Sequence, residues 1–200
     1  MVRDETTPHP ENPYAAPQSG VPIDSVHSED PAIAQLRAFV GPRADVYLAK
    51  WHHLLMGGSG SAGFNWPAFL WSGLWIPYRK MYRVAAILYG TMIATTIGED
   101  VLFVLIGRGQ IPPFLDSAIG LIAALVCGFG ANRWYLAHAR RVIAEVHSLG
   151  LQDSECLAEI SRRGGTSIVA GFGLFVCFIA AVIGVVMFFE LLHTYLEATP

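Results

Sequence analysis

Four long stretches of apolar residues constrain the fold of this chain more than any other feature. They cover residues 64–78, 82–106, 113–131 and 168–192 of the 200-residue sequence. A helix needs about 20 apolar residues to cross a bilayer, so the last three stretches are long enough and the first is short. Charged residues make up only 14% of the chain, against about 25% in soluble domains, and the mean hydropathy is +0.43. The sequence therefore predicts an all-α membrane protein with three transmembrane helices.

The positions of the basic residues support three spans and set the orientation. Lys and Arg gather on the cytoplasmic side of membrane proteins. If the last three stretches span and the N-terminus is cytoplasmic, 12 of the 13 basic residues face the cytoplasm and only Arg108 faces outward. If all four stretches spanned from the same start, eight would face outward. We therefore expect a multi-pass membrane protein with a cytoplasmic N-terminus and an external C-terminus.

The short stretch over 64–78 is rich in aromatic residues. Spacings of seven, four, three and four residues place five aromatic side chains on one helical face: Phe64, Trp71, Trp75, Tyr78 and Tyr82. Trp and Tyr favour the headgroup level, and basic residues after Pro77 can meet lipid phosphates. We expect a re-entrant or interfacial helix, and leave open whether it spans, re-enters or lies flat. The expected membrane anchors are Trp66, Trp71, Trp75, Tyr78, Arg79, Lys80, Tyr82 and Arg83.

The remaining segments divide the chain further. Residues 1–30 hold six acidic residues, one basic residue and five prolines, which predicts a disordered acidic cytoplasmic arm, either a solubilising tail or a docking arm. Residues 31–56 predict amphipathic cytoplasmic helices with basic polar faces suited to anionic lipid headgroups, and residues 57–63 a Gly/Ser linker. The membrane domain then occupies 64–200, and residues 132–167 within it predict a cytoplasmic helical hairpin.

Small residues recur at helical spacing in all three predicted spans. Close approach through small side chains is a main attraction between helices in lipid. The pattern predicts packing inside a three-helix bundle, and contact between copies in a homo-oligomer is left open as the alternative. The expected packing positions are Gly90, Ala94, Gly120, Ala124, Gly128, Gly173, Ala180 and Gly184.

Acidic residues at the predicted outer ends of the spans are the strongest candidates for chemistry. Glu99, Asp100, Asp116, Glu190 and His193 could gather there as a cation site or a proton-linked gate. The simpler interpretation, which we favour, is that each reaches external water, so no metal site is predicted. The sequence shows no nucleophile elbow, HExxH, CxxC or phosphate-binding glycine loop, and thus predicts no catalytic residue and no cofactor. Neither the net charge of −3 nor the three cysteines indicates nucleic-acid binding or a disulfide scaffold.

Several short motifs together resemble a known family. They are Phe39-Val40-Gly41, Tyr47, Lys50-Trp51, the block Phe64-Asn65-Trp66-Pro67-Ala68-Phe69, Leu74-Trp75, the block Tyr78-Arg79-Lys80-Met81-Tyr82, Asn132 to Tyr135, and Gly164-Gly165-Thr166-Ser167. Over about residues 37–192 the chain resembles the bacterial domain of unknown function 2628 (DUF2628) family. The resemblance implies a small multi-pass protein of the bacterial inner membrane with unassigned activity and no catalytic residues to transfer.

Two classes of function are consistent with these features. We favour a non-enzymatic membrane protein that organises or regulates partner proteins. The expected partner is another membrane protein, which the sequence does not identify. The alternative is a small transporter or ion-responsive protein that uses the outer acidic residues.

Overall fold

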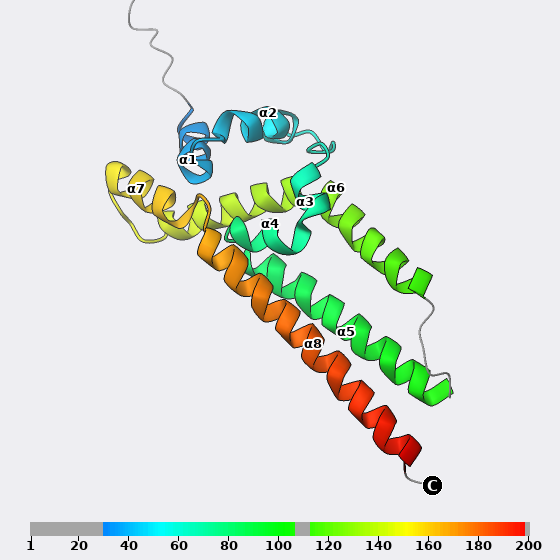
Figure 1. Cartoon of the computed structure of the whole chain (residues 1–200). Helices are drawn as coiled ribbons and strands as arrows, with labels where there is room; N and C mark the ends of the chain where they lie inside the picture. The colour runs from blue at the N-terminus through cyan, green and yellow to red at the C-terminus, as the bar shows by residue number, and fades with distance from the viewer. Residues whose placement is uncertain (1–29, 107–112, 199–200) are drawn as a thin grey trace, which may run out of the picture.

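The computed structural model describes residues 30–106 and 113–198, which form eight α-helices and no strand (Figure 1). The acidic arm expected over 1–30, apart from Asp30, lies outside the described residues, and so does Arg108, which is expected to face outward. The described part divides into a head and a set of long helices that extend away from it. This arrangement confirms the all-α fold class.

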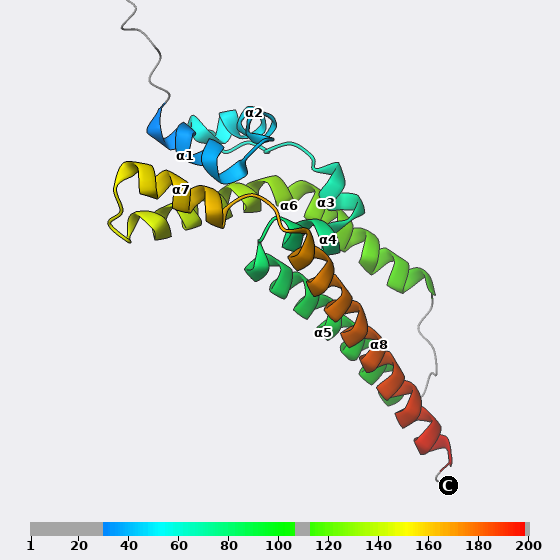
Figure 2. The same ribbon diagram turned by 60° about the vertical axis from the view of Figure 1, so that its left-hand side comes forward.

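The three long helices are α5 (Tyr82–Ile106), α6 (Pro113–His147) and α8 (Ile168–Ala198). These three are long and apolar enough to cross a membrane, as predicted. α5 and α8 lie side by side in Figures 1 and 2. In the most apolar segment of each helix, the protein buries only 6% of the residues of α5 and none of those of α8. Helices that are apolar on all sides and uncovered by their own chain are suited to burial in a bilayer or against further protein.

Helix α6 belongs to both parts of the molecule. Its 35 residues extend over about 52 Å, well beyond the hydrocarbon thickness of about 30 Å. The half that begins at Asn132 lies under α1 (Pro31–Val40) and α2 (Ala44–Leu55) and beside α7 (Asp153–Arg163), as Figures 1 and 2 show. We call α1, α2, α7 and this half of α6 the head.

Helices α1 and α2 bury their apolar faces inside the head. The Asp30 side chain caps α1 by accepting a hydrogen bond from Ala32 N at 2.9 Å, and Pro31 occupies the first turn. Phe39 and Trp51 are fully buried. Helices α6 and α7 cover these apolar faces, and contact of the basic polar faces with anionic lipid headgroups stays a prediction.

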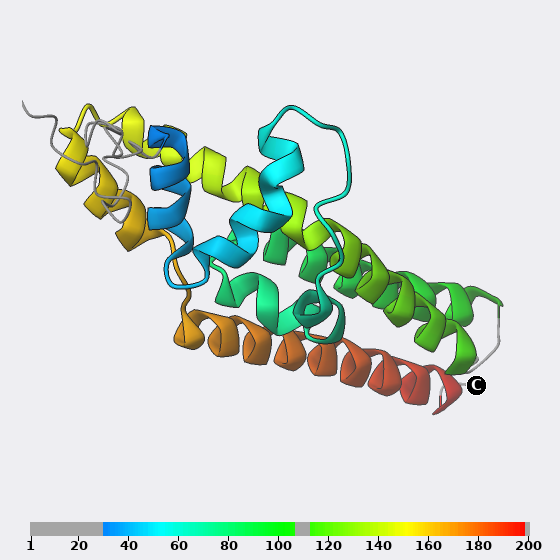
Figure 3. The same cartoon turned by 90° about the horizontal axis from the view of Figure 1, so that it is seen from above.

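The aromatic stretch 64–78 folds as two short helices, α3 (Trp66–Leu70) and α4 (Ser72–Tyr78), and not as one. The chain breaks at Trp71, whose φ of −134° and ψ of 39° are not helical. α3 packs against α6 and α4 against α8, so the pair bridges the two long helices (Figure 3). The break splits the expected aromatic face: Trp71 is 65% exposed, whereas Trp75 is 7% exposed. Helices of five and seven residues are too short to span.

Most of the expected small-residue packing positions make no close contact within the described residues. A Cβ atom added at Gly90, Gly120, Gly173 or Gly184 would meet nothing within 4 Å. Ala94 and Ala180 are exposed and Ala124 is half-buried. The prediction that these four glycines pack against helices of the same chain is therefore wrong. Their contact with a second copy of the chain stays a prediction. Gly128 differs, because an added Cβ would lie 2.5 Å from the Phe64 ring.

Candidate functional site

A buried pair of asparagines joins α6 to the start of α3. Asn65 Nδ2 donates a hydrogen bond to Asn132 Oδ1 at 2.8 Å, and both residues are almost fully buried. Asn132 Nδ2 donates in turn to the carbonyl oxygens of Ala62 at 3.0 Å and Gly63 at 2.9 Å. Asn65 Oδ1 accepts from Ala68 N at 3.1 Å and so caps α3. Every amide group of the pair is used, as a buried polar group requires.

Two further bonds attach neighbouring elements to the same point. Trp51 on α2 is fully buried, and its indole Nε1 donates to the Asn132 carbonyl oxygen at 2.9 Å. Asn65 N donates to the Gly128 carbonyl oxygen at 2.8 Å. The absence of a side chain at Gly128 lets the Phe64 ring lie against α6 there. One turn of α6 thus holds both α2 and the loop before α3.

Arg79, the residue that ends α4, lies in an aromatic cage. Its guanidinium is 4.8 Å from the ring centre of Tyr47 and 5.0 Å from that of Tyr135. Nη2 donates to the Tyr47 hydroxyl at 3.0 Å and Nη1 to the Tyr135 hydroxyl at 3.3 Å. Trp75 and Tyr78 also lie within about 6 Å of the guanidinium. The cage therefore draws on α2, α4 and α6.

The charge in this cage has no acidic partner. Arg79 is 4% exposed, forms no ion pair with a described residue, and its Nε has no hydrogen-bond partner among them. Burying a charge costs several kcal/mol, about 2 kcal/mol of which a desolvated cation–π contact can offset. In an ordinary buried ion pair a carboxylate stabilises the guanidinium charge. Here the aromatic faces and the hydroxyl oxygens stabilise it instead.

Lys80, next to Arg79, fastens the end of α7. It adopts a left-handed backbone with a φ of 58°, which is uncommon for a residue other than glycine. Its Nζ donates to the carbonyl oxygens of Gly164 at 2.6 Å and Arg162 at 3.1 Å. These carbonyls end a helix, where a cation is favourable. Lys80 therefore connects the end of α4 to the end of α7.

The stretch Gly164 to Ser167 completes this connection through the backbone. Gly165 N donates to the Phe39 carbonyl oxygen at 2.7 Å, and Ser167 N donates to the Tyr78 carbonyl oxygen at 2.8 Å. A Cβ at Gly164 would lie 2.2 Å from the Phe39 oxygen, so only glycine fits. The end of α1 and the start of α8 are thereby held to the same region.

We call the residues of this network the junction: Trp51, Asn65, Arg79, Lys80, Asn132, Tyr135, Gly164 and Gly165. They link α1, α2, α3, α4, α6, α7 and the start of α8. Its polar groups bond to structural partners, and no nucleophile is paired with a base within it. The geometry therefore supports a mechanical role for the junction, that of holding the head to the long helices.

The polar face of α7 carries the most perturbed group outside the spans. Glu159 accepts from Arg162 Nε and Arg163 Nε at 2.7 and 2.6 Å. Hydrogen bonds from these two arginines lower the pKa of Glu159 from 4.5 to about 2. These two ion pairs lie at the surface, so they support the last turn of α7 and indicate no chemistry.

The structure divides the expected membrane anchors into two groups. Trp66, Trp71, Tyr82 and Arg83 are exposed, and their position at headgroups stays a prediction. Trp75 and Arg79 are buried, so the expectation that Arg79 meets lipid phosphates is wrong. Tyr78 and Lys80 are half-buried and hold α8 and α7. Arg79 faces inward because α2 and α6 supply aromatic rings that receive its guanidinium.

The expected outer acidic group is only partly assembled. Asp100 lies near enough to Glu190 for the two carboxylates to repel each other, and Asp100 Oδ2 is buried with no hydrogen-bond partner among the described residues. Glu99 and His193 have interactions of their own, and the side chain of Asp116 lies outside the described residues. No three His, Cys, Asp or Glu side chains of the described residues lie close enough to share a metal ion.

Sequence reasoning missed how Trp51, Asn132 and Arg79 act together. The position of Asn132, between the end of the apolar run and Arg133, is a signal that could have singled it out, because a polar group beside such a run needs a partner. Local sequence does not reveal the whole cage around Arg79, since the two rings whose hydroxyls it binds come from residues 32 and 56 positions away.

Comparison with known proteins agrees with the motifs that build the junction. Residues 48–141 match the family model described as protein of unknown function (DUF2628), a segment that contains Trp51, Asn65, Arg79 and Asn132. No curated protein and no solved structure matches the chain significantly. The resemblance inferred from the motifs is thereby confirmed over residues 48–141, the segment that matches the DUF2628 family, whose function is unknown.

Proposed function

We propose that this protein is a non-enzymatic integral protein of the bacterial inner membrane that organises or regulates partner proteins from its head. The observation that carries the proposal is the junction. In the junction, the buried polar groups of the Asn65–Asn132 pair and of the Arg79 cage fix the position of the head relative to the long helices. A head held in one orientation at the membrane surface is suited to presenting a binding surface.

A hollow on the head offers such a surface. It has a volume of about 570 Å³ and lies between α1, α2 and α6, where Leu36, Leu55 and Ile143 supply apolar lining and Arg140 and His147 supply polar lining. Asp30 lies at its rim, and the acidic arm joins the head at this residue. Asp30, the last residue of the arm, therefore lies beside the hollow, which supports a joint role of the two in binding a partner.

The proposal places the head in the cytoplasm and the C-terminus outside. This orientation puts 12 of the 13 basic residues on the cytoplasmic side. Single cysteines at Gly60, Gln110 and Leu196, in a background without the three native cysteines, test it by labelling intact cells. Labelling from outside is expected at 110 and 196 only. External labelling at 60 would contradict the orientation.

A crosslinking pull-down from native membranes tests the function. We expect the full chain to capture a defined membrane protein, and deletion of residues 1–29 to weaken that capture without unfolding the head. A matched variant, Ile33→Glu, places a charge at a half-buried residue that lines the hollow and is expected to lower capture further. Failure of the full chain to capture any protein under gentle extraction would contradict an organising role.

A transporter or ion-responsive protein is the second candidate, favoured only by the closeness of Asp100 to Glu190. Proton and cation flux into vesicles containing the protein would support it, provided that Glu190→Gln reduces the flux. Glu99→Gln, next to Asp100 on α5, provides the comparison. Identical flux in vesicles with and without protein would remove this candidate.

A further inference from the structure

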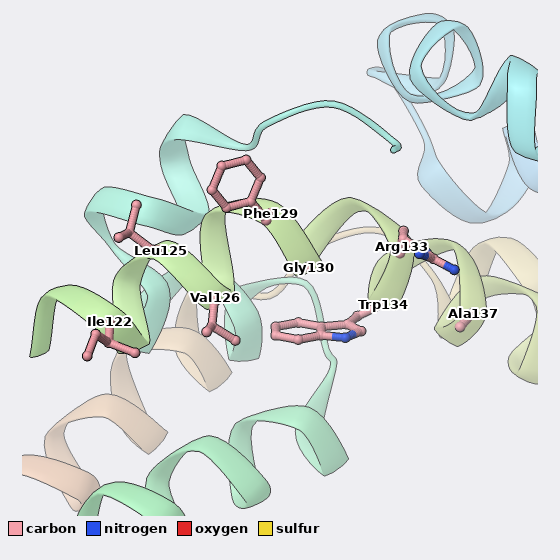
Figure 4. Close-up of a pocket in the computed structure, with 8 residues that line it drawn as sticks. All are labelled: Ile122, Leu125, Val126, Phe129, Gly130, Arg133, Trp134 and Ala137. Carbon is pink, nitrogen blue, oxygen red and sulfur yellow. The ribbon is translucent and has the colours of Figure 1, made fainter. Parts of the chain in front are cut away.

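A groove runs along the side of α6 where this helix passes from its apolar half into the head. It has a volume of about 730 Å³, and Figure 4 shows the side chains that line it, among them Ile122, Val126, Phe129, Arg133 and Trp134. Gly130 makes room for the Trp134 indole, because a Cβ at Gly130 would lie 2.5 Å from that ring. The indole thus forms part of the groove wall at the end nearest the head.

The length of the groove corresponds to one leaflet of a bilayer. Ile122 and Arg133 are eleven residues apart, which is about 16 Å along a helix. Half of a hydrocarbon core of about 30 Å is about 15 Å. The lining is apolar from Ile122 to Phe129, and Arg133 and the Trp134 indole lie at the polar end. One acyl chain has this length and this polarity.

A basic hollow of about 260 Å³ continues the groove at that polar end. Both hollows are lined by Trp134 and Ala137, and the second adds Arg83 and Arg141. Neither of these arginines nor Arg133 forms a hydrogen bond or ion pair with a described residue. The hollow is also lined by Glu145, a single acid, and by Lys80, whose Nζ is already bound to carbonyl oxygens.

His138 adds an independent sign that this hollow takes a ligand. Its side chain lines the hollow, and its Nε2 is buried without a hydrogen-bond partner among the described residues. Buried polar atoms are rarely left without a partner, so one that lines a hollow points to an acceptor or donor that occupies it. A phosphate oxygen can accept from an imidazole N–H and from guanidinium groups together.

We propose that the groove and the basic hollow together bind one anionic glycerophospholipid from the leaflet on the side of the head. Its acyl chain lies along Ile122, Val126 and Phe129, and its phosphate lies among Arg83, Arg133 and Arg141. A zwitterionic lipid binds less well, because its ammonium group would lie beside the same arginines. This binding does not depend on the proposed partner-organising function.

Quenching of Trp134 fluorescence by brominated lipids tests the proposal. The full-length protein is reconstituted in phosphatidylcholine vesicles that contain an equal small fraction of brominated phosphatidylglycerol or brominated phosphatidylcholine. The difference between wild type and Trp134→Phe isolates the Trp134 signal. We expect stronger quenching by the anionic lipid, and Arg133→Gln or Arg141→Gln is expected to lower this preference about fivefold each, as for one basic contact with an anionic lipid.

The adjacent residue Arg140 provides the matched control. It carries the same charge on the same helix but lines the hollow beside Asp30. Arg140→Gln is expected to leave the preference unchanged. Val126→Phe fills the groove and is expected to reduce quenching, whereas Val176→Phe, at an exposed position of α8, is expected to leave it unchanged.

Three results would overturn the proposal. Equal quenching by both brominated lipids would reduce the groove to an ordinary lipid-facing surface. An equal effect of Arg140→Gln and Arg141→Gln would assign the preference to the overall surface charge. Efficient disulfide formation between two copies of a Val126→Cys variant that lacks the native cysteines would assign the groove to a second copy of the chain.

Discussion

Asn65 and Asn132 are 67 residues apart in the chain, and their side-chain amides are hydrogen-bonded at 2.8 Å in the buried centre of the molecule. Asn132 also holds the carbonyl oxygens of Ala62 and Gly63, so this one amide organises the entry of the chain into α3. Buried networks of this kind are strict, because each member leaves its partners unsatisfied when it is removed.

Asn132→Ala is expected to lower the free energy of unfolding by about 1–3 kcal/mol, because it leaves Asn65 Nδ2 and two carbonyl oxygens without partners. Thermal unfolding in detergent measures the loss. The double variant with Asn65→Ala is expected to lose less than the sum of the single variants. Ser148→Ala, which removes an exposed hydrogen bond, serves as the control. Strict additivity of the two asparagine variants would contradict the pairing.

Arg79→Lys is expected to destabilise the protein by about 2 kcal/mol, although it keeps the charge, because an ammonium cannot reach both the Tyr47 and Tyr135 hydroxyls and stack on their rings. Arg83→Lys, at an exposed position, is expected to change little. Melting temperatures of the two variants in the same detergent provide the measurement. Equal melting temperatures would be inconsistent with the cage.

Gly164→Ala and Gly90→Ala are expected to act in opposite directions. At Gly164 the added Cβ would lie 2.2 Å from a backbone oxygen of Phe39, which must shift at a cost of about 1–3 kcal/mol. At Gly90 it meets nothing within 4 Å, and a helical alanine is about 0.5–1 kcal/mol better than glycine. Chemical or thermal unfolding distinguishes the signs. Destabilisation by Gly90→Ala, together with a shift to smaller oligomers, would instead place Gly90 in a contact between copies.

The Glu159 cluster is expected to make the stability of α7 depend on pH in the acid range. Because the arginines lower the pKa of Glu159 from 4.5 to about 2, its stabilising contribution is complete above about pH 4.5 and disappears as the pH falls toward 2. Glu159→Gln is therefore expected to be less stable than wild type at neutral pH, and this difference is expected to shrink on acidification. Unfolding midpoints over this range provide the test. A difference that stays constant with pH would contradict the lowered pKa.

The helical class and the three long apolar helices follow from the chain itself. Runs of apolar residues without charge, such as 168–189, can satisfy their backbone in lipid only as helices, whatever surrounds them. The N-terminal signal of α1 is equally local, since Asp30 and Pro31 cap and start the helix with atoms a few residues apart.

Tertiary structure alone decided which side of the aromatic stretch faces inward. The stripe of Phe64, Trp71 and Trp75 assumes one continuous helix, but Asn65 is held by Asn132 and the chain breaks at Trp71, which turns Trp75 into the core. The position of Arg79 likewise could not be predicted from local sequence. A basic residue beside an interfacial segment normally meets lipid, and here Tyr47 and Tyr135, distant in sequence, provide a more favourable site.

The sequence by itself thus determined the elements that depend on local periodicity and on the solvent: an all-α chain with three helices able to span a bilayer. The tertiary structure decided where the polar and small residues act. Gly90 and Gly184 fit a packing pattern but meet no neighbour, whereas Asn132 and Arg79 join the head to the long helices. Hydrogen bonds and cation–π contacts depend on which groups lie close together in space. Residues that come from α2, α4 and α6 are far apart in the chain, so no local sequence pattern indicates that they will be in contact.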